Sequence, residues 1–440
     1  MFKSSRITLT AFTMALLSGA AVNALSAQAT AAHPTDVKSM VDATYDDMDS
    51  AALWQVDTSN YRDSLLAIAQ AHGNYTNAIL NDVNHTLVIE GTGSPDADVA
   101  AKISAAPSTI TASWQSVPYT SVQLNNAAYA AASGPNVIST AANDAGDGIT
   151  ITINSSSGNL VHDSSSLRAL VADDIPFTIV SGTPPESLVE PASDDYSTSI
   201  RFNDYSPFTA GDGLVGPDGF GVCSTGIPTR SNQTHGARLI FQSECSSEDT
   251  GVEFDEFTSG QKVGMVEAVD QDLQAGTIST SGTDGHLWAG GVHPPGFKYV
   301  VGAITTNPSL GTTVCISNAF SGSNCYGKVS QNSVFIANPS SHIVTGPYLA
   351  VSNELRRPVG GDFDGGSAVH IPLKNHPEQT KILGMEHSGV GSLYRADHCN
   401  GWTNPGGRGR GCFWAVYVLR WTSIRDSLDV SIRTSTPPPS

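Results

Sequence analysis

The feature that most constrains the fold is a series of short β-prone segments over residues 200–432. About a dozen such segments, among them ARLIFQ, KYVVGAITT, SVFIAN and CFWAVYVL, alternate with turns rich in Gly, Pro, Ser and Asn. This pattern is typical of an all-β barrel or sandwich. The helical spacing of Ile, Leu and Val in WTSIRDSLDV predicts a closing helix, and residues 433–440, which include TSTPPPS, are expected to be a disordered tail.

Residues 1–32 have the pattern of a secretory signal peptide. Lys3 and Arg6 precede an apolar stretch, and small residues follow in AVNALSAQATA. A retained anchor helix is the alternative, but Thr and Ser interrupt a stretch that is already short for spanning a bilayer. We therefore expect a secreted, extracellular protein.

All the cysteines lie in the β-rich region: Cys223, Cys245, Cys315, Cys325, Cys399 and Cys412. An even number of cysteines in an exported chain predicts three disulfides, although the sequence permits many pairings. Pairing in sequence order is the simplest arrangement. Zinc binding is the alternative, but no Cys-x-x-Cys or His-x-x-x-His spacing supports a metal site.

Residues 33–182 predict an α+β domain. The order strand, turn, strand, helix, strand occurs twice, at about 72–118 and 135–182, and SVQLNNAAYAAA predicts a helix between the copies. One or two further helices are expected over residues 35–73. We interpret the repeat as a duplicated ββαβ unit, with a chance alignment of weakly similar segments as the alternative. Residues 183–199, rich in Pro, Ser and Asp, form the predicted linker.

The charge of the chain limits its partners. It has 41 acidic and 22 basic residues and a formal charge of -19. Such a charge repels nucleic acid and anionic membranes, so we expect neither as a partner. We interpret the acidity as a contribution to solubility.

Five segments of the β-rich region form an ordered set of motifs. They are FGVCSTGIPTRSNQTHGARLIFQSEC, GTISTSGTDGHLW, LGTTVCISNAFSGSNCYGKV, GGDFDGGSAVHIPL and ILGMEHSGVG. In this order they resemble the secreted trypsin-like serine proteases of actinobacteria, the streptogrisin and α-lytic protease group. The segments are similar to the hairpin before the catalytic histidine, the aspartate strand, a small disulfide loop, the nucleophile turn and the substrate-binding strand. The resemblance implies a double β-barrel, preceded by an α+β pro-region that assists folding.

Carried over residue by residue, the resemblance implies a dismantled catalytic triad. Glu244 occupies the histidine position before Cys245, Asp284 the aspartate position, and Phe363 or Asp364 the serine position. The oxyanion and nucleophile turn would comprise Gly361, Asp362, Gly365 and Gly366. The edge strand that binds an extended peptide would contain Glu386, His387, Ser388 and Gly389.

These residue types remove the chemistry of a serine protease. The triad needs a hydroxyl that attacks, an imidazole that takes its proton and a carboxylate that orients the imidazole. Phe363 has no nucleophile, and Asp364 would be a weak one with no imidazole beside it. Ser367 lies beyond the turn that forms the oxyanion hole, so we do not expect it to act. We therefore expect a non-enzymatic homologue, without cofactor or metal, that binds a peptide or protein in the former substrate cleft.

Two further functions stay open at this point. One is an active secreted serine-type endopeptidase whose nucleophile and base lie elsewhere than in the alignment, and the other is a structural cell-surface protein. The scattered histidines, His286 among them, are interpreted as surface or structural residues. In a retained fold, Glu244, Asp284 and Asp364 are expected to converge. Three carboxylates together need screening by water, a proton on one of them, or a cation such as calcium.

Overall fold

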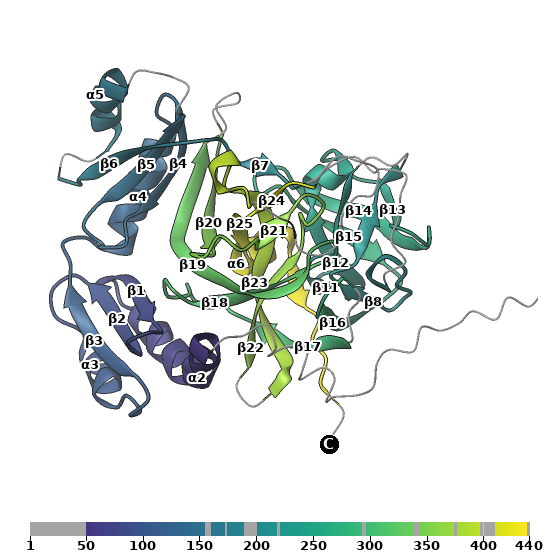
Figure 1. The fold of residues 1–440 in the computed structure, drawn as a ribbon, viewed down its shortest axis with the longest axis horizontal. Coiled ribbons are helices and arrows are strands. Elements are labelled where there is room, and N and C mark those ends of the chain that lie inside the picture. Colours follow the sequence, from purple (N-terminus) through teal and green to yellow (C-terminus); the bar gives the residue numbers. More distant parts are fainter. Residues whose placement is uncertain are drawn as a thin grey trace, which may run out of the picture. The chain divides into compact units, whose positions relative to one another are not determined.

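The structure, a computed structural model, describes residues 50–154, 160–171, 174–188, 200–217, 221–292, 296–337, 343–373, 376–396, 399 and 410–437 (Figure 1). The predicted signal peptide and the linker residues after Leu188 lie outside the described residues. Within the described part of the chain, no helix is both long and apolar enough to cross a membrane.

The first α+β unit has the predicted element order. Helix α2 (Ser50–Ala71) precedes β1 (Tyr75–Asn81), β2 (Thr86–Gly91), α3 (Ala97–Ser104) and β3 (Thr111–Ser116). Strands β1 and β2 are antiparallel, whereas α3 connects the parallel pair β2 and β3. A helical crossover is the usual connection between parallel neighbours. Leu65 of α2, Leu87 and Ile89 of β2 and Val99 of α3 share one buried core.

The second unit repeats this order after helix α4 (Ser121–Ala132), the predicted alanine-rich helix. Its elements are β4 (Val137–Ala142), β5 (Ile149–Asn154), α5 (Leu160–Leu170) and β6 (Phe177–Gly182), and β5 and β6 are again parallel. Thr120 and Gln123 form a capping box at the start of α4. Strand β4 pairs with β19 (Gly322–Ala337), so this sheet is continuous with the β-rich region.

An eight-stranded sheet forms the first part of the β-rich region. Its strand order is β10-β9-β13-β14-β15-β12-β11-β26. The strands are β9 (Gly213–Val215), β10 (Val222–Ser224), β11 (Pro228–Ser231), β12 (Ala237–Gln242), β13 (Glu253–Glu256), β14 (Lys262–Asp270), β15 (Ala275–Thr280) and β26 (Val430–Ile432). Leu239, Phe241, Phe254 and Ile278 form its buried core.

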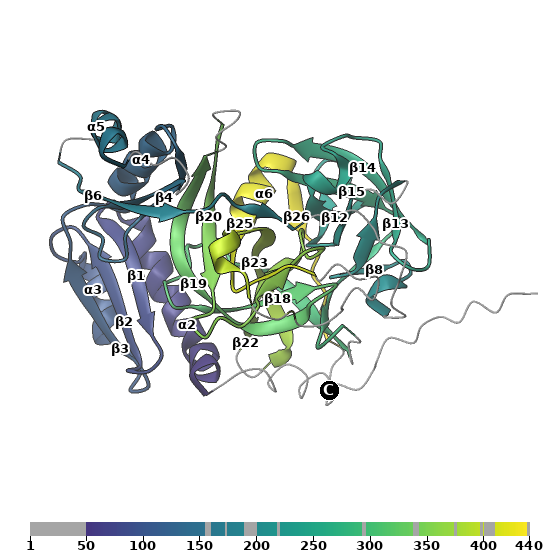
Figure 2. The same ribbon diagram turned by 45° about the horizontal axis from the view of Figure 1, so that its top comes forward.

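Six strands of the second part pair in a closed ring (Figure 2). They are β18 (Thr313–Asn318), β19, β20 (Val344–Ser352), β25 (Ala415–Arg420), β23 (His376–Gly389) and β22 (Ala368–Leu373), and β22 pairs with β18 again. Val314, Leu349, Val369 and Val418 pack in one buried core. The predicted barrel architecture is therefore present in this ring, whereas the described pairings do not close the eight-stranded sheet.

Shorter elements connect and extend the sheets. Strands β8 (Phe208–Ala210), β16 (Thr283–Ala289) and β17 (Gly296–Ala303) continue from β23, and β21 (Gly360–Gly361) pairs with β24 (Cys412–Phe413). The predicted closing helix is α6 (Trp421–Leu428). Short 3-10 helices span Ile200–Phe202, Ser243–Ser246 and Ser392–Tyr394.

The disulfides pair in sequence order, as predicted: Cys223–Cys245, Cys315–Cys325 and Cys399–Cys412. The C-terminal tail differs from its prediction. The Arg433 N–H donates to Pro228 O at 2.9 Å, and the Ser435 N–H donates to Val300 O at 2.8 Å. Residues 433–435 are therefore held against the β-rich region, because these backbone groups find partners there.

Candidate functional site

Part of the predicted linker forms a strand on the predicted peptide-binding edge. Strand β7 (Glu186–Ser187) pairs antiparallel with β23, with Ser187 opposite Ser388 and Glu186 opposite Gly389. Addition of an extended segment to a sheet edge is a common mode of peptide recognition, because the main chain supplies the hydrogen bonds. The segment PPESL, residues 184–188, thus lies where the sequence placed a binding edge for another peptide.

Leu188 joins this strand to the nucleophile turn. Its carbonyl oxygen accepts a hydrogen bond of 2.7 Å from the backbone N–H of Phe363. Its side chain is fully buried and packs in the core that contains Val359, Val369 and Phe413. Backbone N–H groups of a nucleophile turn are the donors that bind a substrate carbonyl in an oxyanion hole, and the sequence predicts such a turn at Phe363.

Glu244 holds the same segment from its other side. The Ser187 hydroxyl donates to Glu244 Oε2 at 2.6 Å. The side-chain amides of Gln242 and Gln274 donate to the two oxygens of Glu244, each at 3.1 Å. The carboxylate therefore accepts hydrogen bonds from three neighbours, and none of them is an imidazole. Residues 184–187, Glu244, Gln274 and His387 also line a cavity of about 530 Å³.

An ion pair fixes the preceding residue of the segment. Arg395 donates from Nε to Glu186 Oε2 at 3.1 Å and also contacts that oxygen through its terminal nitrogen. The Arg395 guanidinium lies 5.6 Å from the centre of the Phe413 ring. Sequence reasoning missed Arg395, because its acidic partner is far away along the chain.

The residues at the serine position have structural partners. Phe363 has φ of +74° and packs with Phe320 in an apolar cluster. Asp364 is fully buried, and its Oδ1 accepts from the backbone N–H groups of Phe320 and Ser321, each at 3.1 Å. Arg410 and the Ser321 hydroxyl bind its other oxygen. Burial raises the pKa of Asp364, and the Arg410 guanidinium offsets part of that rise.

Arg410 is a site residue that the sequence did not identify. It lies in NPGGRGRG, a segment whose glycines indicate only a turn. Its side chain is 1% exposed, and Nε donates to Asp362 O at 2.6 Å. Asp362 Oδ2 in turn accepts from the Gly411 N–H at 2.5 Å. Arg410 thereby ties both aspartates of the turn to the segment that precedes Cys412.

The glycines of the turn permit close approach of other chain segments. Gly361 lies in β21, beside Cys412. A Cβ atom on Gly365 would lie 2.2 Å from Gln242 Oε1, and one on Gly366, where φ is +98°, would lie 2.4 Å from Ser224 O. Only glycine fits both the space and the left-handed backbone at Gly366.

The three carboxylates that were expected to converge each have separate partners among the described residues. Asp284 lies on β16, where Oδ2 is 2.7 Å from His286 Nδ1 and accepts from Thr209 Oγ1 at 3.3 Å. Glu244 binds Ser187, and Asp364 binds Arg410. The motif order assigned Asp284 to the aspartate position of the triad, next to the histidine position at Glu244. In the structure, the side chain that contacts Glu244 from this direction along the chain is Gln274. The described residues also contain no group of three His, Cys, Asp or Glu side chains placed to hold a metal.

The hydroxyl and imidazole groups near the turn have local partners. The Ser367 hydroxyl is buried and donates to Asp364 O at 2.6 Å. His387 Nδ1 lies 3.1 Å from Ser388 Oγ, but burial lowers the pKa of His387 to about 4, so it is a weak base. Glu386 is buried beside Asp364. Burial, followed by the negative charge of Asp364, raises the pKa of Glu386 well above its usual range.

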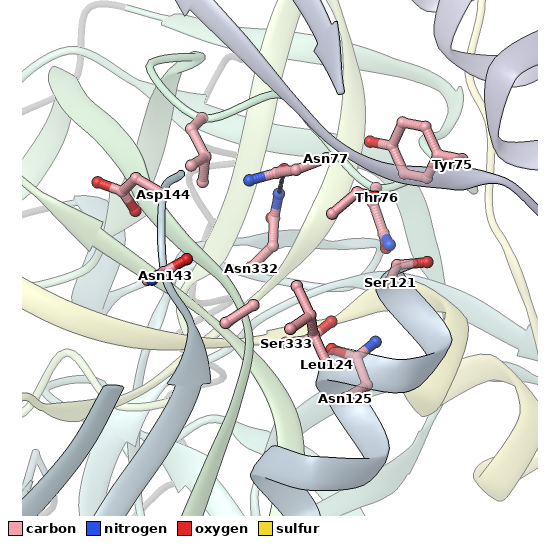
Figure 3. A pocket seen from close by; sticks show the side chains of 13 residues that line it. Tyr75, Thr76, Asn77, Ser121, Leu124, Asn125, Asn143, Asp144, Asn332 and Ser333 are labelled. Atoms are coloured by element: carbon pink, nitrogen blue, oxygen red, sulfur yellow. Dashed lines mark hydrogen bonds between the residues drawn. The ribbon is translucent and has the colours of Figure 1, made fainter. Parts of the chain in front are cut away.

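A second cavity is too small for a ligand (Figure 3). It lies among β1, α4 and β19 and has a volume of about 20 Å³, which suits a single water molecule. Asn332 Nδ2 donates to Asn77 Oδ1 at 3.3 Å across it. The cleft around residues 184–188 is the candidate functional site, because it adjoins both the predicted binding edge and the predicted nucleophile turn.

Comparisons with known proteins give structural likeness only. No family model matches the chain, and no curated protein matches it. Thermobifida fusca protease A is 14% identical, with a TM-score of 0.35 over 52% of this chain and 98% of that chain. A glutamic acid-specific serine protease is 13% identical, with a TM-score of 0.37 over 51% and 100%. Cellulomonas bogoriensis chymotrypsin is 15% identical, with a TM-score of 0.35 over 52% and 98%. Values this low assign neither a family nor an activity.

Proposed function

We propose that this chain is a secreted protein of trypsin-like protease architecture whose cleft has no proteolytic activity and binds an extended peptide. The cleft is filled by the chain's own residues 184–188 when no other peptide is bound. The observation that carries this proposal is the contact of Leu188 O with the Phe363 N–H, in register with the pairing of β7 and β23. The signal-like N-terminus and the three disulfides support secretion.

The groups around Leu188 O support the proposed lack of proteolytic activity. A protease would place a nucleophile and a base beside this carbonyl. Here Phe363 turns into an apolar cluster, Asp364 is paired with Arg410, and Glu244 accepts a hydrogen bond from Ser187. None of these side chains can take a proton from a hydroxyl and also attack the carbonyl carbon.

The same contacts define the peptide that the cleft would take. The pocket of Leu188 suits a large aliphatic side chain, the carboxylate of Glu244 a hydroxyl donor, and Arg395 an acidic residue. The matching ligand is an extended peptide with acidic, hydroxyl and aliphatic residues in succession.

A labelled peptide of residues 183–191 tests the proposal in trans. We expect it to bind a Leu188→Asp variant, whose own segment cannot enter the apolar pocket, and to bind the wild type much more weakly. A peptide with Asp at the position of Leu188 is the matched control and should not bind. A Glu186→Ala/Ser187→Ala variant provides a second way to weaken the internal segment. Failure of the peptide to bind either variant would overturn the proposal, as would casein hydrolysis by the wild type that Asp364→Asn abolishes.

A further inference from the structure

A hydroxyl, an imidazole and a carboxylate also meet outside the cleft, where the C-terminal tail passes β16 and β17. Asp284 and His286 lie on either side of Gly285 in β16, and their side chains are in contact. His286 Nδ1 lies 2.7 Å from Asp284 Oδ2, and His286 Nε2 lies 3.1 Å from Ser435 Oγ. This is the order of groups by which a serine hydroxyl is activated in unrelated folds.

Each group is held by further contacts. Asp284 Oδ1 accepts from the His286 backbone N–H at 3.0 Å, and Oδ2 accepts from Thr209 Oγ1 at 3.3 Å. The imidazole packs against the rings of Phe297 and Tyr299, with centroid distances of 4.1 and 4.8 Å. Because a nucleophile works only from a fixed geometry, this support matters as much as the two contacts among the three groups.

The carboxylate acts on the imidazole through its charge. The contact of Nδ1 with Asp284 has the distance of an ion pair without the alignment of a full hydrogen bond. A negative charge on this side of the ring favours the proton on Nδ1. Nε2 is then free to accept the proton of the Ser435 hydroxyl.

The cluster is within reach of solvent and small reagents. The side chains of His286 and Asp284 are 14% and 11% exposed, and Ser435 is partly exposed. Gly285, with φ of +75°, lets the tail approach, since a Cβ there would lie 3.0 Å from Arg433 O. The backbone N–H of Ser435 is engaged with Val300 O and so cannot serve an oxyanion. The site therefore suits acyl donors with a good leaving group and not peptide bonds.

We propose that Ser435 is an activated nucleophile, with His286 as its general base and Asp284 as a positioning residue, and that it takes small activated acyl donors such as aryl esters. Ser435 Oγ bonds to the acyl carbon while its proton passes to His286 Nε2. The bond to the aryloxy group breaks, and His286 returns the proton to the departing phenolate. Water then attacks the acyl-serine, giving up a proton to His286, which returns it to Ser435 Oγ as the carboxylic acid leaves.

A fluorophosphonate probe on the full-length protein tests this site directly. Fluoride leaves as the phosphonyl group bonds to the serine oxygen, and trypsin then releases residues 434–440 as one C-terminal peptide. We expect the label on Ser435 of that peptide and none in Ser435→Ala. His286→Gln should label about 100-fold more slowly, because the general base is lost. The labelling rate of Asp284→Asn should fall between those of the wild type and His286→Gln. The rates of p-nitrophenyl acetate hydrolysis should decrease in the same order, from wild type through Asp284→Asn to His286→Gln.

Ser431→Ala is the matched control, since Ser431 is a partly exposed hydroxyl on the neighbouring β26. It should label like the wild type. An unlabelled wild type, a label on another serine, or an unchanged rate in His286→Gln would each overturn the proposal. Thermal melting of every variant shows whether its fold is retained. Peptide binding in the cleft does not involve these residues, so the two proposals succeed or fail separately.

Discussion

Truncation of Leu188 to alanine should weaken the binding of residues 184–188 in the cleft. The Leu188 side chain is fully buried in the core of the six-stranded ring, and its backbone carbonyl binds the Phe363 N–H. Alanine keeps the backbone bond but loses the side-chain packing. Opening of residues 184–188 should therefore become easier, while the barrel itself stays folded.

The burial of Leu188 sets the size of this effect. Leucine-to-alanine changes at fully buried sites cost roughly 2–5 kcal/mol, and we take about 3 kcal/mol for Leu188. Since about 1.4 kcal/mol corresponds to a tenfold change, the opening equilibrium should rise by about 150-fold.

Hydrogen exchange of the peptide covering residues 183–188 measures this opening. Its amide exchange should be about 150-fold faster in Leu188→Ala than in the wild type, because exchange follows the population of the open form. Leu355→Ala is the matched control, since Leu355 is 75% exposed. Equal protection of this peptide in wild type and Leu188→Ala would refute the assignment of Leu188 to the cleft.

Two further predictions concern buried charges. Burial raises the pKa of Asp204 to about 6 and those of Asp212 and Glu256 well above their usual range, so the folded state holds protons that the unfolded state releases. The stability that Asp204 contributes should be complete below about pH 4 and decrease by about 3 kcal/mol as the pH rises through about 6. Urea unfolding across this range should show a smaller decrease in Asp204→Asn, and identical pH profiles would contradict the prediction. Arg410→Ala should lower the free energy of unfolding by about 3–5 kcal/mol, because it leaves the Asp364 carboxyl buried without its partner. Asp364→Asn in the same chain should restore part of that loss, and an unchanged unfolding midpoint in Arg410→Ala would show that the pair is unimportant.

The sequence was most informative where structure depends on neighbouring residues. The two ββαβ orders, helix α4 and helix α6 follow from local apolar spacing and turn residues, and the structure has them where they were predicted. The sequential disulfides also agree, because each pair closes a short loop of 22, 10 or 13 residues. Local patterns therefore sufficed for the element order and the covalent framework.

The site was less predictable because its contacts join distant segments. Nothing in PPESL marks Leu188 as the partner of Phe363, and nothing in a Gly-rich turn marks Arg410 as the partner of Asp364. Asp284 was assigned to the aspartate position of the triad from the order of the motifs alone. The spacing of Asp284 and His286, two residues apart in a β-prone segment, was a sequence signal that these side chains could meet, and the structure brings them into contact.

The peptide bond between Leu188 and Val189 tests most directly whether the cleft lacks proteolytic activity. Leu188 O accepts a hydrogen bond from the Phe363 N–H, so an enzyme that used this turn as its oxyanion hole would cut its own chain after Leu188. The intact mass of the purified protein, followed over a long incubation with inhibitors of other proteases present, reports on this bond. We expect a chain with the bond intact, because the described side chains nearest this carbonyl, Phe363, Asp364 and Glu244, have other partners. Fragments ending at Leu188 and beginning at Val189, formed by the wild type and absent from Asp364→Asn, would contradict the account.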